Sequence, residues 1–334
     1  MIDVFIDPSF EPIFRAHPLV LVDVGARGGP RPNWRLAKRH LRYVGFEPDR
    51  DEFARLAASG AITAEHRILN VALHNRPGPV RLHVARSGGL SSIFEPHREF
   101  IDKFPDAGRF DTVDSRTIEA DRLDHQLALH GIDGIDFIKA DTQGSEVLVL
   151  EGASESLRSC VIGVEVEVGF SEFYRDQPLF ADVDRFMRNA GFWLFDIRPC
   201  YWKRAIGQAE GGPRGQLIWG DTLYFKSPAR LAETARGFEG TRRIATVLKA
   251  ISVALLYGYA DYALELAHDR ALPLESDQRT RIDRHIRGAA ARRDGMPSFP
   301  GRRGLAGAVH RLWKLLRERD NGWSVSGAEI GNFD

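Results

Sequence analysis

The stretch that most constrains the fold of this 334-residue chain is Leu21 to Gly29, with the sequence Leu-Val-Asp-Val-Gly-Ala-Arg-Gly-Gly. Its apolar first half is typical of a buried strand, and the glycines that follow predict a tight turn into a helix. In an open α/β sheet, ligands bind beyond the carboxyl ends of the strands, where a glycine-rich turn lets the backbone approach closely. The stretch therefore predicts an α/β fold with a nucleotide-like ligand at this turn.

The residues of the turn narrow the choice of ligand. A dinucleotide fingerprint has the spacing Gly-x-Gly-x-x-Gly. This turn has Gly25, Gly28 and Gly29 instead, and Asp23 lies two residues before the first glycine. An acid in that place is unfavourable for a pyrophosphate but suits a cationic or amine-bearing ligand. The turn thus favours S-adenosylmethionine, and its glycine spacing disfavours NAD.

A second acid, Glu47, follows the next predicted strand, at the position where nucleotide-binding folds hold a ribose. Leu41 to Phe46 has the pattern of a second strand, and Glu47 and Pro48 close it about 20 residues beyond the glycine turn. A carboxylate at the end of this strand accepts hydrogen bonds from ribose hydroxyls. The alternative is that Asp23 and Glu47 are ordinary polar residues flanking a structural turn, since loose glycine-rich matches are frequent.

A third acid ends another predicted strand. The apolar residues of Ile135 to Ala140 indicate a buried strand that ends at Asp141, and Glu146 then opens a helix whose first turn favours an acid. Because the carboxyl ends of parallel strands share one edge of a sheet, we expect Asp141 to lie at the same edge as Asp23 and Glu47.

Two more acids lie inside a predicted strand, Val161 to Val168. Alternation of side chains places Glu165 and Glu167 on the same face, opposite the valines. Buried central strands seldom carry two acids, so we expect at least one of them at or beyond the carboxyl end of the strand. The polar loop Ser87 to Ser92, with two glycines, is expected to close over the site.

The rest of the chain completes the expected organisation. The other predicted strands are Thr112 to Ile118 at an edge, Arg67 to Leu73 with Val80 to Val84 as a hairpin or a short addition to the sheet, and Phe192 to Ile197 with Asp221 to Lys226 as the last two strands. From Ser227 onward the pattern is helical. We therefore expect two units, residues 1–226 and a helical C-terminal extension of residues 227–334. The arginine-rich tail is expected to be a solvated helical cap or an oligomer contact.

Composition limits the partners of the chain. With 46 basic and 46 acidic side chains its formal net charge is zero, which gives no global attraction to nucleic acid or to a membrane. The two cysteines, Cys160 and Cys200, lack a metal-ligand spacing. Met1 to Phe14 carries acids instead of the basic start and apolar core of a secretion signal, and no apolar run is long enough to span a bilayer. The default expectation is a cytoplasmic protein.

These features together resemble the FkbM-like family of S-adenosylmethionine-dependent methyltransferases. The resemblance spans roughly residues 18 to 226, and its most distinctive feature is Asp-x-x-Gly-x-Glu in a strand-to-helix turn, here Asp141 to Glu146. The other matching stretches are Val22 to Ala26 with Gly29, Val44 to Pro48, Asn70 to Ala72, Phe137 to Ala140, and Glu151 to Ala153.

The resemblance implies a class I methyltransferase fold. That fold has a Rossmann-like seven-stranded sheet, an antiparallel last strand and helices on both faces. By position, the glycine turn would hold the methionine end of S-adenosylmethionine, Glu47 the ribose, and Asn70 to Ala72 the rim of the adenine, with Asp141 next to the transferable methyl group. The implied cofactor-binding residues are Asp23, Gly25, Ala26, Arg27, Gly29, Glu47, Pro48, Asn70, Val71, Ala72 and Asp141.

Two residues depart from the usual pattern of the family. Arg27 stands where the family commonly has asparagine, and an arginine there is placed to pair with the carboxylate of the cofactor. Gln143 stands where the family commonly has glutamate. This second departure removes a charge near the reaction centre and argues against a mechanism that needs two carboxylates in that turn.

Methyl transfer is an in-line displacement, so an enzyme gains most by aligning donor and acceptor and by excluding water. A hydroxyl acceptor also benefits from a base, for which Asp141 is the first candidate, then Glu165 or Glu167, and then His97. The alternatives are a structural contact for Asp141 and a merely exposed His97. Carboxylates at adjacent strand ends also suit a divalent metal, but no histidine or asparagine at a diagnostic spacing favours one.

The sequence thus predicts an S-adenosylmethionine-dependent O-methyltransferase for a hydroxyl of a sugar, glycan or related small polar acceptor. Basic and aromatic residues are not interleaved as in a nucleic-acid surface. The alternative is a non-catalytic cofactor-binding or scaffold protein whose helical tail mediates assembly. Sugars stack on aromatic rings, and the candidates for that contact, which plain core packing explains equally, are Phe170, Phe173, Tyr174, Trp193, Tyr201 and Trp202.

Overall fold

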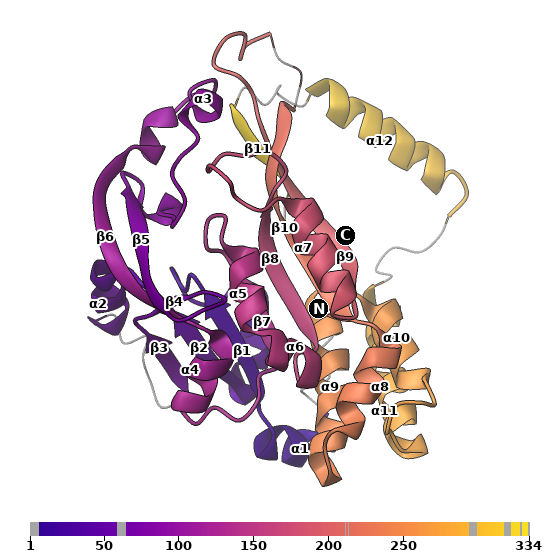
Figure 1. The fold of residues 1–334 in the computed structure, drawn as a ribbon. Coiled ribbons are helices and arrows are strands. Elements are labelled where there is room, and N and C mark those ends of the chain that lie inside the picture. The colour runs from indigo at the N-terminus through magenta and orange to yellow at the C-terminus, as the bar shows by residue number, and fades with distance from the viewer. Residues whose placement is uncertain are drawn as a thin grey trace.

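The computed structural model describes residues 7–58, 65–210, 212, 214–293, 299–316, 322–327 and 329–332. An eight-stranded sheet in the order β11-β9-β10-β8-β7-β1-β2-β3 forms its centre, and a smaller three-stranded sheet stands beside it (Figure 1). The strands of the large sheet are β1 (Leu19–Val24), β2 (Leu41–Phe46), β3 (His66–Leu69), β7 (Phe137–Ala140), β8 (Gly163–Gly169), β9 (Phe192–Trp202), β10 (Gln216–Lys226) and β11 (Ser324–Ser326).

The strand directions confirm the class I methyltransferase arrangement. The five strands β3, β2, β1, β7 and β8 run parallel to one another. Strand β10 runs antiparallel to both β8 and β9. Helices cover both faces of this sheet. One detail differs from the expectation, because the sheet has eight strands instead of seven: β11 pairs with β9 and extends the edge.

The smaller sheet has the order β4-β6-β5, from strands Ala72–Leu73, Thr112–Asp121 and Gly78–Ala85. Residues 112–118 form a strand, as predicted, but in the small sheet, where this part of β6 pairs with β5 in an antiparallel ladder. The predicted third strand, residues 67–73, is confirmed in its first half as β3 of the large sheet. It does not form a hairpin with residues 80–84, because residues 72–73 form β4 and pair with β6. The small sheet therefore starts at the carboxyl edge of the large one.

One face of the large sheet is covered by four helices from the middle of the chain. Their apolar side chains share a buried core with Val22 of β1, Val44 of β2 and Val164 of β8. Central parallel strands covered on both faces carry near-continuous apolar residues, which explains the composition of β1 and β7. These helices are α4 (Leu123–Leu129), α5 (Glu146–Gly152), α6 (Ser154–Ser159) and α7 (Phe180–Asn189).

The opposite face is covered by the C-terminal helices. In α9 (Gly240–Leu256) every residue from Ala245 to Leu256 is buried, as in a helix that lies inside a core. Its side chains share that core with Leu19 and Leu21 of β1, so these helices form a layer of the α/β fold. A domain boundary at residue 226 stays a prediction. The other elements on this face are α1 (Glu11–Ala16), the 3-10 helix η2 (Pro32–His40), α8 (Pro228–Arg236), α10 (Ala260–His268) and α11 (Ser276–Arg293).

The connection between the last two long strands is shorter than predicted, because the β9–β10 ladder already pairs Gln216 with Trp202. An aromatic cluster that includes Phe110, Tyr174 and Trp202 packs near this end of the ladder. Among the described residues, no helix has both the length and the apolar character needed to cross a bilayer. The remaining elements are α2 (Arg50–Ala58), η3 (Gly88–Leu90), α3 (Arg98–Ile101), η4 (Ala107–Phe110) and α12 (Arg302–Leu316).

Candidate active site

A cavity of about 310 Å³ lies beyond the carboxyl ends of β1, β2 and β7. Each strand end contributes a lining residue: Gly25 after β1, Glu47 after β2 and Asp141 after β7. The volume falls within the range of small-molecule sites, about 300–1,000 Å³. The cavity therefore lies where a doubly wound sheet binds its ligand.

Gly25 is required by the close approach of the β1 turn to β7. Its φ is +78°, in the left-handed region that favours glycine, and a Cβ atom there would lie 2.1 Å from the carbonyl oxygen of Asp141. The Gly25 N–H group also donates to the carbonyl oxygen of Phe46 at 3.0 Å, which ties the turn to β2. Bare backbone thus forms the floor of the cavity at this point.

Glu47 lines the cavity from the end of β2. Its side chain is buried, and one carboxylate oxygen accepts the N–H of Asp49 at 3.0 Å. Burial raises the pKa of Glu47 to about 7. The side-chain amide of Asn70 donates to the backbone oxygens of Glu47 at 2.8 Å and Pro48 at 3.2 Å, and so fixes the turn. Within the described part of the chain, the other carboxylate oxygen has no partner and is available to a ligand hydroxyl.

One wall of the cavity is apolar and comes from the small sheet. Leu82 of β5 and Ile118 of β6 line it, and Ile93 joins them from the segment between these strands. Val71 and Ala72, which were predicted to form the rim of an adenine site, also line the cavity. Apolar walls of this kind suit a flat aromatic ring.

Residues of the polar loop Ser87 to Ser92 line the cavity, and closure of this loop over the site stays a prediction. The hydroxyl of Ser92 donates to the carbonyl oxygen of Gln143 at 2.6 Å. The hydroxyl of Tyr174 lies 2.8 Å from the carbonyl oxygen of Leu90, so the loop is held at two points. The loop residues in the cavity lining are Gly88, Gly89, Ser91 and Ser92.

Gln143 joins two carboxylates at the end of β7. Its side-chain nitrogen donates to Asp141 at 2.9 Å and to Glu167 at 2.8 Å, and its side-chain oxygen lies 3.1 Å from the hydroxyl of Tyr174. The backbone of Gln143 has φ +57°, which is uncommon for a residue other than glycine. Residues held in such conformations cluster at functional sites, because the surrounding structure must enforce them.

The two carboxylates bridged by Gln143 differ in their surroundings. Asp141 lines the cavity with a side chain that is 35% exposed, whereas Glu167 is buried and lies outside the lining. Burial, reinforced by the negative charges of Asp141 and Glu146, raises the pKa of Glu167 well above its usual range. A glutamate in place of Gln143 would bring a third carboxylate to the same spot.

The predicted cofactor residues divide into two groups. Those in the cavity lining are Gly25, Arg27, Glu47, Pro48, Val71, Ala72 and Asp141, and those outside it are Asp23, Ala26, Gly29 and Asn70. Asp23 is only 1% exposed and accepts hydrogen bonds from the Tyr43 hydroxyl at 2.8 Å and the Lys139 ammonium at 3.1 Å. Its contact with the methionine end of a cofactor stays a prediction, while its observed role is a buried ion pair beside the turn.

Besides Glu167, two other predicted catalytic residues lie outside the cavity lining, Glu165 and His97. Glu165 faces the C-terminal helices, where it accepts a hydrogen bond from Tyr257 at 2.8 Å and pairs with Arg31 at 2.7 Å. The expectation that one acid of this strand lies at or beyond its end is wrong, since β8 extends to Gly169. The Nδ1 atom of His97 lies 3.0 Å from the carbonyl oxygen of Glu172. Catalytic roles for both residues stay predictions.

The aromatic residues proposed for the acceptor side do not line this cavity. Phe173, Tyr174 and Trp202 are buried together in the aromatic cluster, which agrees with the alternative of plain core packing. The hydroxyl groups that do line the cavity belong to Ser91, Ser92, Thr142 and Ser145.

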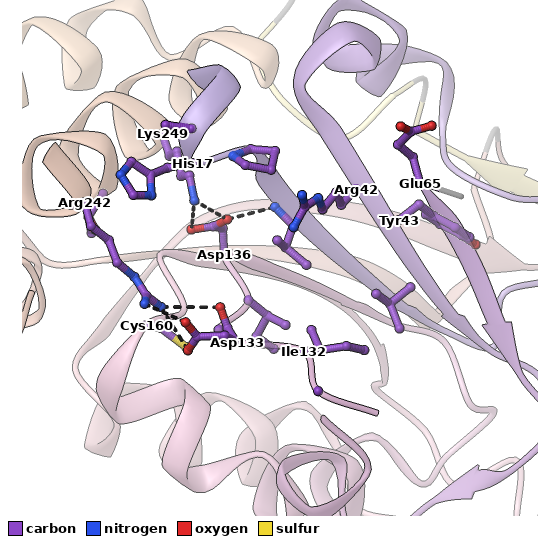
Figure 2. Close-up of a pocket in the computed structure, with 18 of the residues that line it drawn as sticks. His17, Arg42, Tyr43, Glu65, Ile132, Asp133, Asp136, Cys160, Arg242 and Lys249 are labelled. Carbon is purple, nitrogen blue, oxygen red and sulfur yellow. Dashed lines mark hydrogen bonds and ion pairs between the residues drawn. The ribbon is translucent and has the colours of Figure 1, made fainter. Parts of the chain in front are cut away.

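A second cavity, of about 440 Å³, lies at the opposite edge of the sheet, where β1 and β2 begin. Figure 2 shows two charge pairs in it: Lys249 donates to both oxygens of Asp136 at 2.8 and 3.0 Å, and Arg242 donates to Asp133 at 2.8 Å. Asp136 also accepts the N–H of Val20 at 2.8 Å, and Arg42 and Glu65 line the same cavity. The buried Asp136 is thus satisfied by the fold itself, and the cavity lies away from the carboxyl edge, so the smaller cavity is the candidate active site.

A family model described as the methyltransferase FkbM domain matches residues 23–194, just over half of the chain. The chain belongs to the FkbM methyltransferase family. The matched FkbM region contains the ends of β1, β2 and β7, and with them Gly25, Glu47 and Asp141.

Known proteins similar to this FkbM chain include the 2-O-methyltransferase NoeI of Sinorhizobium fredii, with 28% identity over 173 residues, 49% of this chain and 70% of NoeI. The structure of methyltransferase FkbM from Methylobacillus flagellatus KT is 16% identical with a TM-score of 0.37, and the match covers 62% of this chain but only 43% of that one. Magnesium protoporphyrin IX methyltransferase from Synechocystis PCC 6803 is 10% identical with a TM-score of 0.32, over 66% and 77% of the two chains.

The FkbM family implies S-adenosylmethionine as the cofactor, and the cavity fits this molecule. Gly25 leaves its floor without a side chain, Glu47 offers a free carboxylate oxygen for ribose hydroxyls, and Leu82 with its neighbours forms an apolar wall for adenine. The described residues contain no cluster of three or more histidine, cysteine or acidic side chains that could hold a metal ion.

Several lining residues of the FkbM site were not predicted. Leu82 and Ile118 reach it only through the pairing of the small sheet, which leaves no local signal in the sequence. Thr142 and Ser145 lie inside the distinctive Asp141 to Glu146 turn, so their position in that turn is a signal that could have found them. The other unpredicted members include Phe46, Asp49 and Ile93.

Proposed function

We propose that the protein is an S-adenosylmethionine-dependent O-methyltransferase that acts on a hydroxyl of a sugar, glycan or related small polar acceptor. The observation that carries this proposal is the position of Asp141, which lines the cavity next to Gly25 in a turn held by Gln143. The similarity to a protein named 2-O-methyltransferase supports oxygen as the accepting atom.

S-adenosylmethionine bound here would supply a methyl group on a positively charged sulfur, and the acceptor oxygen would displace that sulfur from the methyl carbon. Asp141 accepts the proton of the acceptor hydroxyl on its second carboxylate oxygen, which Gln143 does not contact and which lies 4.0 Å from the Lys139 ammonium. Gln143 orients this carboxylate and, by donating to Glu167 as well, lies between the two acids. The loop Ser87 to Ser92 keeps water away from the site.

Binding and turnover test the proposal separately. We would measure heat-unfolding midpoints of the full chain with S-adenosylhomocysteine, with NAD and with neither. We would then follow transfer of a labelled methyl group to a panel of mono- and oligosaccharides. Asp141→Asn should keep the S-adenosylhomocysteine shift and lose transfer by about 10²–10⁴-fold, because it removes the base but keeps the shape. Asp133→Asn, at the second cavity, is the matched control and should change neither.

The outcomes distinguish the alternatives. A midpoint raised by NAD instead of S-adenosylhomocysteine would contradict the cofactor assignment. A protein that binds S-adenosylhomocysteine but methylates no hydroxyl acceptor would favour the non-catalytic, scaffold alternative. Transfer that survives unchanged in Asp141→Asn would remove Asp141 as the base. A cytoplasmic location and an oligomer formed through the helical tail stay predictions.

A further inference from the structure

Helix α12 (Arg302–Leu316) differs from every other long helix of the described chain in its surroundings. All of its side chains that the structure describes are exposed, and Figure 1 shows the helix apart from the others, at the upper right. An isolated helix of about 15 residues is only marginally stable in water, because most helices gain their stability by packing an amphipathic face. Because the described side chains of α12 are exposed, the surface that stabilises this helix is sought beyond the described residues.

The apolar residues of α12 form one face. Leu305, Val309, Leu312, Trp313 and Leu316 follow each other at intervals of three and four residues, the period of one side of a helix. Each of these side chains is more than half exposed. No other group of large exposed apolar residues in the described chain shares an element in this way, since Leu36, Val113, Leu129 and Trp193 each lie on a different one, and Ile206 and Phe299 lie outside helices and strands.

The charge of this segment has a single sign. Residues 295–317 contain five arginine and lysine residues and no aspartate or glutamate, although the whole chain has equal numbers of basic and acidic residues. Arg303 and Arg311 lie on the side of α12 away from the apolar face, by their spacing along the helix. The helix therefore combines an apolar face that contains a tryptophan with a purely basic polar face.

We infer that α12 is an interfacial helix that docks the protein onto an anionic lipid bilayer. Such a surface meets both requirements, because it accepts an apolar helix face in the boundary between headgroups and acyl chains and attracts lysine and arginine. A second copy of the chain fits less well, since two α12 helices would bring basic segments together with no acid to pair with them. A nucleic acid would attract the charge but leave the apolar face uncovered.

Co-sedimentation of the full chain with lipid vesicles tests this inference. The protein should sediment with vesicles of equal parts phosphatidylglycerol and phosphatidylcholine, but not with phosphatidylcholine alone, and added salt should release it. Leu312→Glu should abolish binding. Arg303→Gln and Arg311→Gln should each weaken it about fivefold, the effect of about one charge near a lipid surface. Leu129→Glu, an equally exposed leucine on α4, is the matched control and should bind as the wild type does.

Two further measurements make the result decisive. The emission of Trp313 should shift to the blue on binding, and this shift should disappear in Trp313→Phe. Melting midpoints should be unchanged in all variants, because the substituted side chains of α12 and Leu129 are exposed in the structure. Equal binding to both kinds of vesicle, no binding to either, or normal binding by Leu312→Glu would overturn the inference. So would a dimer seen by light scattering without lipid that Leu312→Glu dissociates, because the face would then join two copies.

Discussion

The two cavities lie at opposite edges of the same sheet, and they differ in the partners of their buried acids. At the amino edge, the cavity of about 440 Å³ pairs its buried acid Asp136 with Lys249 and with a backbone N–H group. At the carboxyl edge, the cavity of about 310 Å³ is surrounded by Glu47, Asp141 and the buried Glu167, whose hydrogen-bond donors are amide groups and backbone N–H groups, and the Lys139 ammonium lies 4.0 Å from Asp141. The larger of these two cavities is therefore not the candidate active site.

The difference shows how a fold separates stability from function. A buried acid beside a buried base holds the helix layer to the sheet and leaves nothing for a ligand. Burial raises the pKa of an acid, as the pKa of about 7 for Glu47 and the raised pKa of Glu167 show, and such groups are candidates for functional sites. Substitutions at the amino edge should therefore change stability, and substitutions at the carboxyl edge should change ligand binding.

The largest effect is expected at the amino edge. Asp136→Ala leaves the ammonium of Lys249 buried without its partner, which should lower the free energy of unfolding by about 3–5 kcal/mol. Denaturant titration measures this loss. Asp133→Ala, which removes an acid that is 86% exposed from the same cavity, is the control and should cost little. If folded Asp136→Ala no longer gained stability from S-adenosylhomocysteine, the expected separation between a stabilising amino edge and a ligand-binding carboxyl edge would be wrong.

The second effect belongs to the carboxyl edge. In Gly25→Ala the new Cβ atom would meet the carbonyl oxygen of Asp141, so the turn must move into the cavity. The variant should lose the stabilisation by S-adenosylhomocysteine, which is about 2.7 kcal/mol at 100 times the dissociation constant. Gly28→Ala is the matched control, because Gly28 has a similar φ of +82° but no atom within 4 Å of the new Cβ. If both variants lost the stabilisation by S-adenosylhomocysteine, the cause would be backbone strain at the turn instead of the contact with Asp141.

Local features of the sequence were sufficient to predict much of this edge. Gly25, Glu47 and Asp141 were found because each directly follows an apolar strand, and parallel strands end at one edge. The class I fold followed from the order of these elements and from the family resemblance. The helices after residue 227 were predicted as an extension, yet α9 fills the core beside β1, and nothing in a buried helix tells which layer it joins.

What could not be predicted depends on contacts between distant segments. Asp23 was assigned to the cofactor. The register of β1 with β7 places Lys139 beside it, and the Lys139 ammonium donates to the Asp23 carboxylate. The apolar wall of Leu82 and Ile118 exists only because β5 pairs with β6. Strand β11 has the sequence Ser-Val-Ser, which is too short to carry a pattern of its own.

The third prediction concerns pH at the carboxyl edge. The pKa of Glu47 is about 7 in the folded protein and near 4.5 when unfolded, so the folded state binds the proton more tightly. The wild type should therefore lose stability relative to Glu47→Gln as pH rises from 4.5 to 7. Ribose hydroxyls need the ionised carboxylate, so affinity for S-adenosylhomocysteine should increase roughly tenfold from pH 6 to 8. Calorimetric titration of both proteins checks this, and equal pH slopes would rule Glu47 out as the titrating group.

The smallest expected effect is a change in ligand affinity at Arg27, a cation in the cavity at the carboxyl edge. It tests the comparison of the two cavities most sharply, because the other charged residues that line this cavity are acids. Arg27 lines the carboxyl-edge cavity with a side chain that is 47% exposed, and its nearest acid, Glu52, is 3.6 Å away. Arg27→Met should weaken S-adenosylhomocysteine about fivefold, near 1 kcal/mol, if Arg27 pairs with the carboxylate of the ligand. Methylthioadenosine, which lacks that carboxylate, should bind both proteins equally. Arg55→Met is the control, since Arg55 pairs with the same Glu52 but lies outside this cavity. Equal weakening of both ligands would place Arg27 in the wall of the cavity, as a packing contact instead of a recognition contact.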